Sequence, residues 1–225
     1  MIHIDGRDVL TSLDELVDPR RAALLIVDMQ RDFIEADGAF GTLGVDLSMY
    51  SDMHPRLVDL LGAARDAGTL VVHIQMTALG GRVSDSPAQI RFNMRMHKEA
   101  QNGAPPLRYT EIGTPGREFV DGLQPRPGEV VVPKWRSSAF WGTCLDLILR
   151  SNDIETVIVT GCTTEGCVES TARDAMFNDY YVVIAEDCVA SDDRQQHDAS
   201  MLLMRHRFDV APSKEIAAIW IGAGD

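Results

Sequence analysis

The strongest structural signal in the sequence is AALLIVDM, residues 22–29, an apolar run interrupted only by Asp28. Apolar residues that follow one another without alternation are typical of a strand buried on both faces. Further apolar runs predict strands at residues 69–76, 129–132, 156–160 and 181–185. We expect the strand at 129–132 to stop at Pro133, because proline cannot donate a ladder hydrogen bond.

Helical patterns separate these runs. Apolar residues at 3.6-residue spacing predict helices over residues 55–67, 140–150, 167–177 and 192–207, with a short final strand at 208–210. Alternating strands and helices favour an α/β fold: a three-layer, Rossmann-like architecture with a mostly parallel central sheet and helices on both faces. In such folds ligands bind beyond the carboxyl ends of the strands.

The length of 225 residues and the absence of a linker-like stretch favour one domain spanning residues 1–225. Residues 77–128 form a long excursion rich in glycine, proline and charge, with residues 91–100 as its best helical pattern. A long irregular segment in a compact domain is usually a lid, a binding loop or an oligomer contact. The sequence leaves these three roles open.

The composition of the chain argues against nucleic acid and membranes as partners and favours the cytoplasm as its location. The chain is 45% hydrophobic and 24% charged, and 21 basic against 34 acidic residues give a net charge of −13. This balance argues against nucleic acid or an anionic membrane as the main partner. No apolar run approaches the roughly 20 residues of a membrane helix, and no leader-like pattern opens the chain. Four cysteines without disulfide or zinc spacing complete the prediction of a cytoplasmic protein with reduced thiols.

Three polar residues are predicted to lie close together at the carboxyl edge of the parallel sheet. Asp28 and Lys134 follow buried strands, and Cys167 begins a predicted helix after the loop 161–166. A helix N-terminus and a nearby cation both lower a thiol pKa, so Lys134 could tune Cys167 while Asp28 accepts its proton. Alternatively, Cys167 is a packing cysteine and the two charges are solvated. The trio together favours a nucleophilic site.

Substrate contacts are predicted more loosely, from positions after strands or within the excursion. Aromatic side chains could equally pack in the core or at a rim, Arg136 could clamp a carboxylate or be a surface charge, and Thr164 could bind substrate or cap the helix. The candidates are Phe33, Gln75, Tyr109, Arg136, Trp141 and Thr164.

Three blocks of sequence carry a resemblance to a known family. They are ALLIVDMQRDF at 23–33, PKWRSSAF at 133–140 and TGCTTEGCVESTARDA at 160–175. In this order they resemble the isochorismatase-like cysteine hydrolase superfamily, and the resemblance covers about residues 22–210. It implies the isochorismatase-like hydrolase fold and an Asp–Lys–Cys triad, which falls on Asp28, Lys134 and Cys167.

The resemblance also implies how the site is arranged. It places a cis peptide between Cys162 and Thr163, and an oxyanion hole formed by the backbone N–H groups of Thr163 and Cys167. Nicotinamidases of the superfamily carry an Asp-x-His metal motif after the second strand, whereas this chain has HIQM at 73–76 and an isolated His97. We therefore expect neither a metal nor another cofactor.

Within the superfamily, the loop GCTTEGCV at 161–168 is similar to that of N-carbamoylsarcosine amidases. The segment that follows Lys134 is similar to ureidoacrylate amidohydrolases, and biuret hydrolases attack related bonds. The resemblance thus implies an amidohydrolase that cleaves a carbamoyl, ureido or linear amide C–N bond through a thioester and releases ammonia. Two alternatives stay open: hydrolysis of another small electrophile on the same triad, and a catalytically idle binding or scaffold protein. The resemblance also implies a homo-oligomer, either a dimer or a tetramer.

Overall fold

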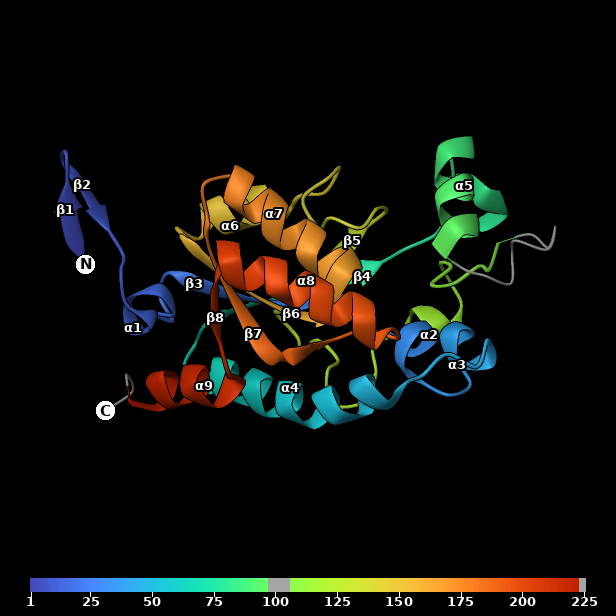
Figure 1. Ribbon diagram of the computed structural model, residues 1–225, viewed down its shortest axis with the longest axis horizontal. Coiled ribbons are helices and arrows are strands. Elements are labelled where there is room, and N and C mark those ends of the chain that lie inside the picture. The colour runs from blue at the N-terminus through green and yellow to red at the C-terminus, as the bar shows by residue number, and fades with distance from the viewer. Residues whose placement is uncertain (97–105, 223–225) are drawn as a thin grey trace.

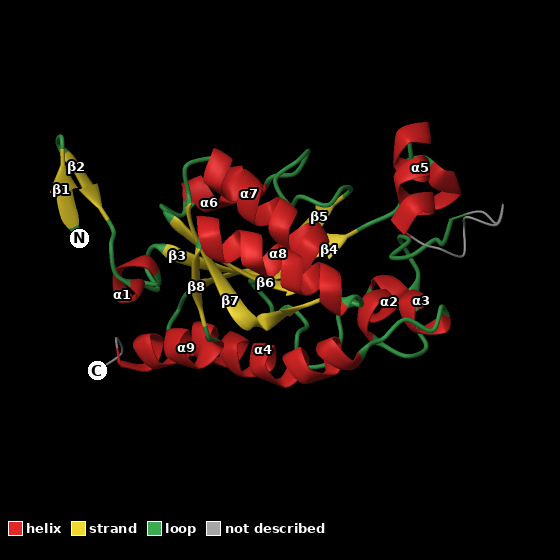
Figure 2. Ribbon diagram, viewed as in Figure 1, coloured by secondary structure: helices red, strands yellow, loops and turns green. Residues whose placement is uncertain are grey.

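The centre of the molecule is a six-stranded parallel sheet (Figures 1 and 2). The computed structural model describes residues 1–96 and 106–222. Within them the strand order is β5-β4-β3-β6-β7-β8. The strands are β3 (Ala22–Val27), β4 (Leu70–Met76), β5 (Val130–Lys134), β6 (Thr156–Cys162), β7 (Tyr181–Ala190) and β8 (Asp209–Ala211). The α/β fold with a parallel sheet is thus confirmed.

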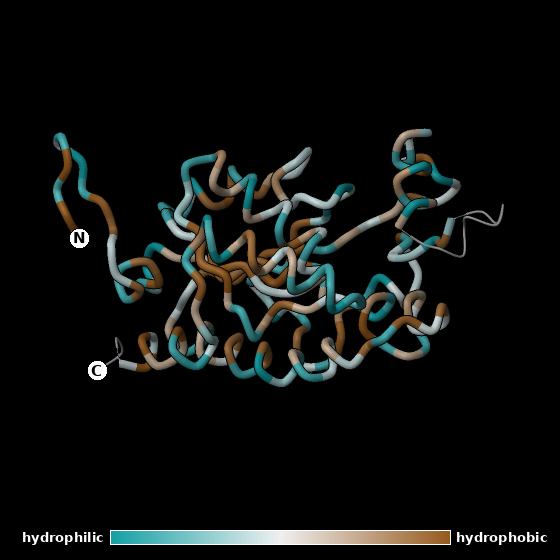
Figure 3. Tube along the Cα trace, in the orientation of Figure 1, coloured by the Kyte–Doolittle hydropathy of each residue, from teal (hydrophilic) through white to brown (hydrophobic). Residues whose placement is uncertain are grey.

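Helices cover both faces of the sheet, which explains the unbroken apolar runs. All six residues of β3 are buried, and alternate side chains enter different cores. Leu24 and Ile26 face the core beneath α4 (Ser48–Asp66) and α9 (Ser213–Gly222). Leu25 and Val27 face the core shared with α6 (Leu145–Ser151), α7 (Glu169–Phe177) and α8 (Arg194–Arg207). Figure 3 shows the hydrophobic strands between these two helical layers.

Two elements run through a proline where the sequence predicted a boundary. β5 continues past Pro133 to Lys134, because β5 is an edge strand that pairs only with β4 and does not need every ladder donor. α4 begins at Ser48 and contains Pro55, so the predicted helix at 55–67 was too short. Tyr50 and Met53 of its first turns are buried in the core, and this packing outweighs the lost helical hydrogen bond.

The order in which successive strands are added to the sheet reverses between β3 and β6. From β3 the chain moves outward to β4 and β5, and from β6 it moves the other way to β7 and β8. The carboxyl ends of β3 and β6 therefore border the crevice at this switch point. Gly161 lies there with φ of +102°, and a Cβ atom on it would lie 2.0 Å from the carbonyl oxygen of Val27.

The remaining elements surround this sheet. A hairpin of β1 (Ile2–Ile4) and β2 (Arg7–Val9) projects from the body, followed by α1 (Leu13–Leu16) (Figure 1). α2 (Arg31–Ile34) and α3 (Ala39–Thr42) follow β3. The excursion at 77–128 holds η1 (Gly80–Arg82), α5 (Pro87–Met96) and η3 (Pro115–Arg117). Of the helix predicted at 91–100, residues 97–100 lie outside the described residues. Among residues 1–96 and 106–222, none of the helices combines the length and apolar character needed to cross a bilayer.

Candidate active site

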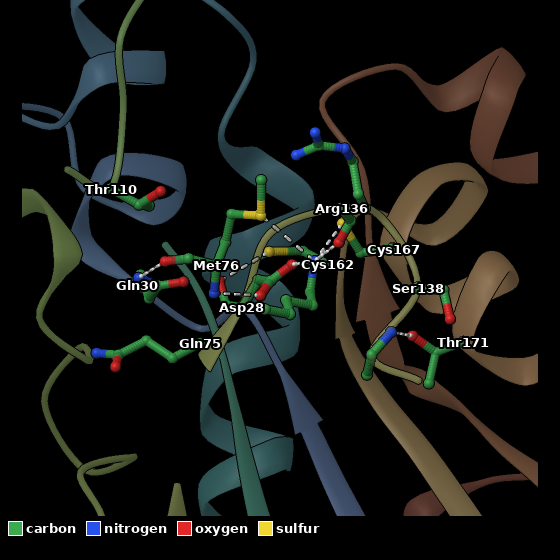
Figure 4. Close-up of polar contacts among 12 residues, drawn as sticks. Asp28, Gln30, Gln75, Met76, Thr110, Arg136, Ser138, Cys162, Cys167 and Thr171 are labelled. Atoms are coloured by element: carbon green, nitrogen blue, oxygen red, sulfur yellow. Dashed lines mark hydrogen bonds and ion pairs between the residues drawn. The ribbon is translucent and has the colours of Figure 1, made fainter. Parts of the chain in front are cut away.

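Asp28, Lys134 and Cys167 meet at the carboxyl edge of the sheet (Figure 4). The Nζ atom of Lys134 lies 2.8 Å from Oδ2 of Asp28 and 3.1 Å from Sγ of Cys167. The side chains of Asp28 and Lys134 are almost fully buried, at 1% and 0% exposure. A buried ammonium therefore bridges a carboxylate and a thiol that are 139 residues apart in sequence (167 minus 28).

The ends of three strands hold the two charged side chains in place. Asp28 follows β3 in a left-handed conformation, with φ of +54°, and its amide donates to the carbonyl of Ile74 at 3.1 Å. Its Oδ1 accepts from the amide of Met76 at 2.8 Å, so β4 fixes the carboxylate orientation. Lys134 ends β5 and also donates to the carbonyl of Arg136 at 2.9 Å. These bonds leave the ion pair little rotational freedom.

Cys167 lies in a π-helical turn, η4 (Thr164–Val168), that immediately precedes α7. The sequence predicted Cys167 as the first residue of a helix at 167–177, but the regular α-helix begins only at Glu169. The carbonyl of Thr163 accepts from the amides of Gly166 and Val168 at 3.2 and 3.1 Å, which tightens the loop. Turns of this rare type are frequent at functional sites, where they re-aim one side chain.

The peptide bond between Cys162 and Thr163 is cis. Cys162 is buried, and its Sγ donates to the carbonyl of Asp28 at 3.3 Å, which ties the end of β6 to the end of β3. Thr163 and Cys167 both line the cavity described below. The role of their backbone N–H groups as an oxyanion hole stays a prediction.

Burial dominates the electrostatics of the trio. It raises the pKa of Asp28, although the attraction of Lys134 partly offsets the shift. It raises the pKa of Cys167 to about 12, because the loss of hydration and the nearby Asp28 carboxylate outweigh Lys134. Burial opposes the charge on Lys134, but the attraction of Asp28 and Cys167 exceeds it and raises its pKa. Lys134 lowers the pKa of Cys167 as predicted, but burial and Asp28 outweigh this effect, so the net shift of the Cys167 pKa is upward.

A cavity of about 100 Å³ opens above Cys167. Its apolar wall contains an aromatic cluster in which the ring centroids of Phe33, Phe40 and Tyr109 lie 5.0 to 5.7 Å apart. α5 contributes Phe92 and Met96. The polar lining beyond the trio includes Gln89, Ser137, Glu165 and Asp192. A small ligand here would lie beside Cys167, aromatic rings and carboxylates together.

Comparison with known proteins identifies the family. The isochorismatase domain family matches residues 22–215. The chain belongs to the isochorismatase family. It is 34% identical, over 177 residues and 75% of each chain, to the ureidoacrylate amidohydrolase RutB of Enterobacter sp. (strain 638). The predicted family is therefore confirmed, and the chain is a hydrolase.

Solved structures of isochorismatase-like proteins share the fold. A cysteine hydrolase from Pseudomonas syringae pv. phaseolicola 1448A has a TM-score of 0.78 at 26% identity, over 92% of this chain and 96% of that one. N-carbamoylsarcosine amidase from Thermoplasma acidophilum has a TM-score of 0.65 at 28% identity, over 86% and 96%. The sheet and its helical layers are thus those of isochorismatase-like hydrolases.

The predicted substrate contacts of this isochorismatase-family hydrolase separate into two groups. Phe33 and Tyr109 line the cavity. Gln75 instead donates to the carbonyl of Arg117 at 3.0 Å. Thr164 is buried and shares a 2.8 Å hydrogen bond with Nδ1 of His197 on α8.

Arg136 and Trp141 also lie outside the cavity above Cys167. The guanidinium of Arg136 hydrogen-bonds to the carbonyls of Trp135 and Ser84 and stacks over Trp141 at 5.6 Å. Trp141 is 60% exposed. In Figure 4 the Arg136 guanidinium points away from the Asp28–Cys167 pair.

Sequence reasoning missed several residues that shape the cavity. Asp32 accepts hydrogen bonds from the amides of Thr110 and Ala39, at 2.5 and 3.1 Å, and so joins the segments that carry Tyr109 and Phe40. In the sequence, Asp32 belongs to the block ALLIVDMQRDF at 23–33, but nothing there predicted its structural role. Glu165 belongs to the loop at 161–168 that was quoted for the family resemblance. Asp192 carried no sequence signal, because the strand was predicted to end at 185 whereas β7 extends to Ala190.

Within the described residues, no group of three or more His, Cys, Asp or Glu side chains is placed to hold a metal ion.

Proposed function

We propose that this chain is a cysteine amidohydrolase that cleaves a carbamoyl, ureido or linear amide C–N bond of a small molecule through a thioester on Cys167. The observation that carries the proposal is the buried Lys134 ammonium, which lies within 3.1 Å of both the Asp28 carboxylate and the Cys167 sulfur beside a ligand-sized cavity. The names of the ureidoacrylate amidohydrolase and the N-carbamoylsarcosine amidase support the choice of bond.

The first step needs a general base, because burial raises the pKa of the Cys167 thiol. Asp28 takes the thiol proton as the sulfur attacks the substrate carbonyl carbon, and Lys134 balances the negative charge that moves through the trio. The oxyanion of the tetrahedral intermediate accepts hydrogen bonds from the N–H groups of Thr163 and Cys167. A preorganised pair of donors of this kind lowers the barrier, and one donor is typically worth about 3 kcal/mol.

The second half of the reaction restores the enzyme. Asp28 returns the proton to the leaving nitrogen, the C–N bond breaks, and ammonia departs to leave an acyl- or carbamoyl-Cys167. Asp28 then takes a proton from a water molecule that attacks the thioester carbonyl. The C–S bond breaks, the sulfur regains its proton, and the acid or carbamate is released.

The decisive experiment measures ammonia release by wild type, Cys167→Ala and Cys144→Ala. The panel contains N-carbamoyl amino acids, ureidoacrylate analogues, biuret, maleamate and nicotinamide. Cys144 is the matched control because its thiol is exposed and lies outside the cavity. We expect Cys144→Ala to match wild type, and Cys167→Ala to lose at least about 1,000-fold in kcat/KM because its nucleophile is gone.

A second readout tests the covalent intermediate. Intact-protein mass spectrometry of acid-quenched wild type should show the mass of one acyl or carbamoyl group, and Cys167→Ala should show none. Ammonia release that survives Cys167→Ala would overturn the nucleophile assignment. Turnover of esters but not of any amide would favour the alternative of another electrophile.

A further inference from the structure

Two polar side chains of α8 contact the chain around Cys167, and the proposed mechanism uses neither of them. Nδ1 of His197 shares a 2.8 Å hydrogen bond with the hydroxyl of Thr164, the first residue of η4. One turn further along α8, Oγ of Ser200 donates to Oε2 of Glu169 at 2.5 Å and lies 3.4 Å from the carbonyl oxygen of Thr164. Thr164 precedes Cys167 and Glu169 follows it, so α8 holds the chain on both sides of the nucleophile.

These contacts are shielded from water. Thr164 is fully buried, and Ser200 is buried too. Burial lowers the pKa of His197 and so favours the neutral ring, whose Nδ1 can accept the hydrogen of the Thr164 hydroxyl. Glu169 is also fixed by its own helix, because its Oε1 accepts from Nε and Nη2 of Arg173 at 2.8 and 2.6 Å. Buried groups lose much by giving up a partner, so these contacts favour one arrangement of the turn.

The side chains of this network lie apart from the substrate. Thr164, His197 and Ser200 do not line the cavity above Cys167. The Thr164 hydroxyl, which the sequence left between substrate binding and helix capping, instead contacts His197. The turn between Thr164 and Glu169 is π-helical, a rare conformation that α7 does not continue. An effect of α8 on the reaction would therefore pass through the shape of this turn.

We propose that His197 is a positioning residue: it orients Cys167 for attack by holding the η4 turn through Thr164. Ser200 supports the other side of the turn through Glu169. This inference rests on the proposed function for its kinetic test. A nucleophile must approach the carbonyl carbon within a narrow range of distance and angle, and a displacement of about 1 Å can cost about 100-fold in rate. Loss of the His197 contact should thus slow the attack and leave substrate affinity nearly unchanged.

Steady-state kinetics of His197 variants test the proposal. We expect His197→Leu to lower kcat for ammonia release by about 10- to 100-fold, with KM within about threefold of wild type, because the lining of the cavity stays intact. His197→Asn should recover most of this loss, since its Oδ1 lies nearly where Nδ1 was and can accept from Thr164. His206→Leu is the matched control, because His206 is an exposed histidine on the same helix.

Two further variants keep the test independent of a general loss of packing. His197→Gln keeps a polar side chain but places its amide near the former Nε2, so it should lose kcat as His197→Leu does. In the Thr164→Val background the hydroxyl is absent, and His197→Leu should then change kcat by less than about twofold. A loss of the same size in both backgrounds would show that His197 acts by packing alone and would overturn the proposal.

Alkylation of Cys167 needs no amide substrate and therefore separates this inference from the proposed function. Iodoacetamide forms a C–S bond as its C–I bond breaks, with release of iodide and the thiol proton, and peptide mass spectrometry gives the rate at each cysteine. We expect the rate at Cys167 to fall at least about tenfold in His197→Leu and to recover in His197→Asn. The exposed Cys144 is the internal control and should react at the wild-type rate in both variants.

The outcomes point to different conclusions. A rate of Cys167 alkylation in His197→Leu that equals or exceeds the wild-type rate would overturn the positioning role, as would a failure of His197→Asn to recover activity. Absence of ammonia release from every amide tested would instead overturn the proposed function, while the alkylation rates of Cys167 would still decide whether His197 orients the sulfur.

Discussion

At the scale of single residues, the chemistry depends on where one proton resides. Burial raises the pKa values of both Asp28 and Cys167, while Lys134 stays charged between them. We infer that the resting site holds a thiol beside a carboxylate–ammonium pair, because the 2.8 Å contact between Lys134 and Asp28 favours the charged forms of both. Activity requires an ionised Asp28, because a protonated carboxyl cannot accept the proton of Cys167.

The pH dependence of the rate follows from this requirement. We expect kcat/KM for an uncharged amide to fall tenfold per pH unit on the acid side, with a midpoint above 3.8, the ordinary pKa of an aspartate. The pKa of Asp28 is raised, so the base form is lost at a higher pH than usual. The measurement is a pH profile of kcat/KM from pH 4 to 9.

Two variants test whether Asp28 causes the fall of kcat/KM on the acid side, here called the acid limb. Glu165→Gln should keep it, whereas Asp28→Asn should have only residual activity that no longer changes on the acid side. A profile that stays flat down to pH 4 in wild type would contradict the role of Asp28, as would an acid limb that disappears in Glu165→Gln.

At the scale of elements, the site depends on how closely β3 and β6 approach each other. Val27 pairs with Gly161 in the register of the two strands, and the hydrogen bond of Cys162 to the carbonyl of Asp28 continues the contact beyond the strand ends. Gly161 combines a left-handed backbone with contact against the Val27 backbone, so no larger residue fits. The loop that carries Thr163 and Cys167 starts from this point.

Gly161→Ala should therefore reduce the free energy of unfolding by more than about 2 kcal/mol, because strain and backbone overlap add together. Gly62→Ala is the matched control. Gly62 lies inside α4, and no atom lies within 4 Å of the position that a methyl group would take, so alanine should stabilise the helix by about 0.5–1 kcal/mol. Urea unfolding at neutral pH measures both. A loss below about 0.5 kcal/mol for Gly161→Ala would show that β3 and β6 can separate without cost.

At the scale of the whole molecule, a buried polar network joins α4 to the far edge of the sheet. The carboxylate of Glu129, which precedes β5, accepts from Arg65 of α4 at 2.7 and 2.9 Å and from the amide of Arg126 at 2.8 Å. It also pairs with Nε2 of His73 on β4 at 2.9 Å. Burial opposes the charge of Glu129, but these partners outweigh it and lower its pKa to about 2 from 4.5.

This network should make the fold sensitive to acid. Because the folded pKa of Glu129 is lowered, its contribution is complete above about pH 4.5 and is lost as the pH falls toward 2. The shift corresponds to about 3 kcal/mol, of which about 2 kcal/mol should be lost by pH 3. The test compares unfolding free energies of wild type and Glu129→Gln at pH 6 and pH 3. A difference between them that does not shrink at pH 3 would refute the role of Glu129.

The sequence alone was sufficient for the features set by local pattern. Unbroken apolar runs indicated doubly buried strands, and their alternation with helical patterns indicated a parallel sheet, as β3, β4 and β6 show. The three sequence blocks indicated the family, and strand-end positions indicated that Asp28, Lys134 and Cys167 would lie close together. These predictions succeed because side-chain periodicity and strand-end placement follow directly from the order of residues along the chain.

Other features were decided only when distant segments packed together. Pro133 is compatible with β5 because that strand lies at the edge, and the pKa of the Cys167 thiol is raised because burial and Asp28 outweigh Lys134. Arg136 turns toward backbone carbonyls rather than the cavity, while Glu165 and Asp192 come together there from different loops. Solvation and through-space charge depend on every segment that surrounds a group, so tertiary structure, not local sequence, determined the proton and the charge of this site.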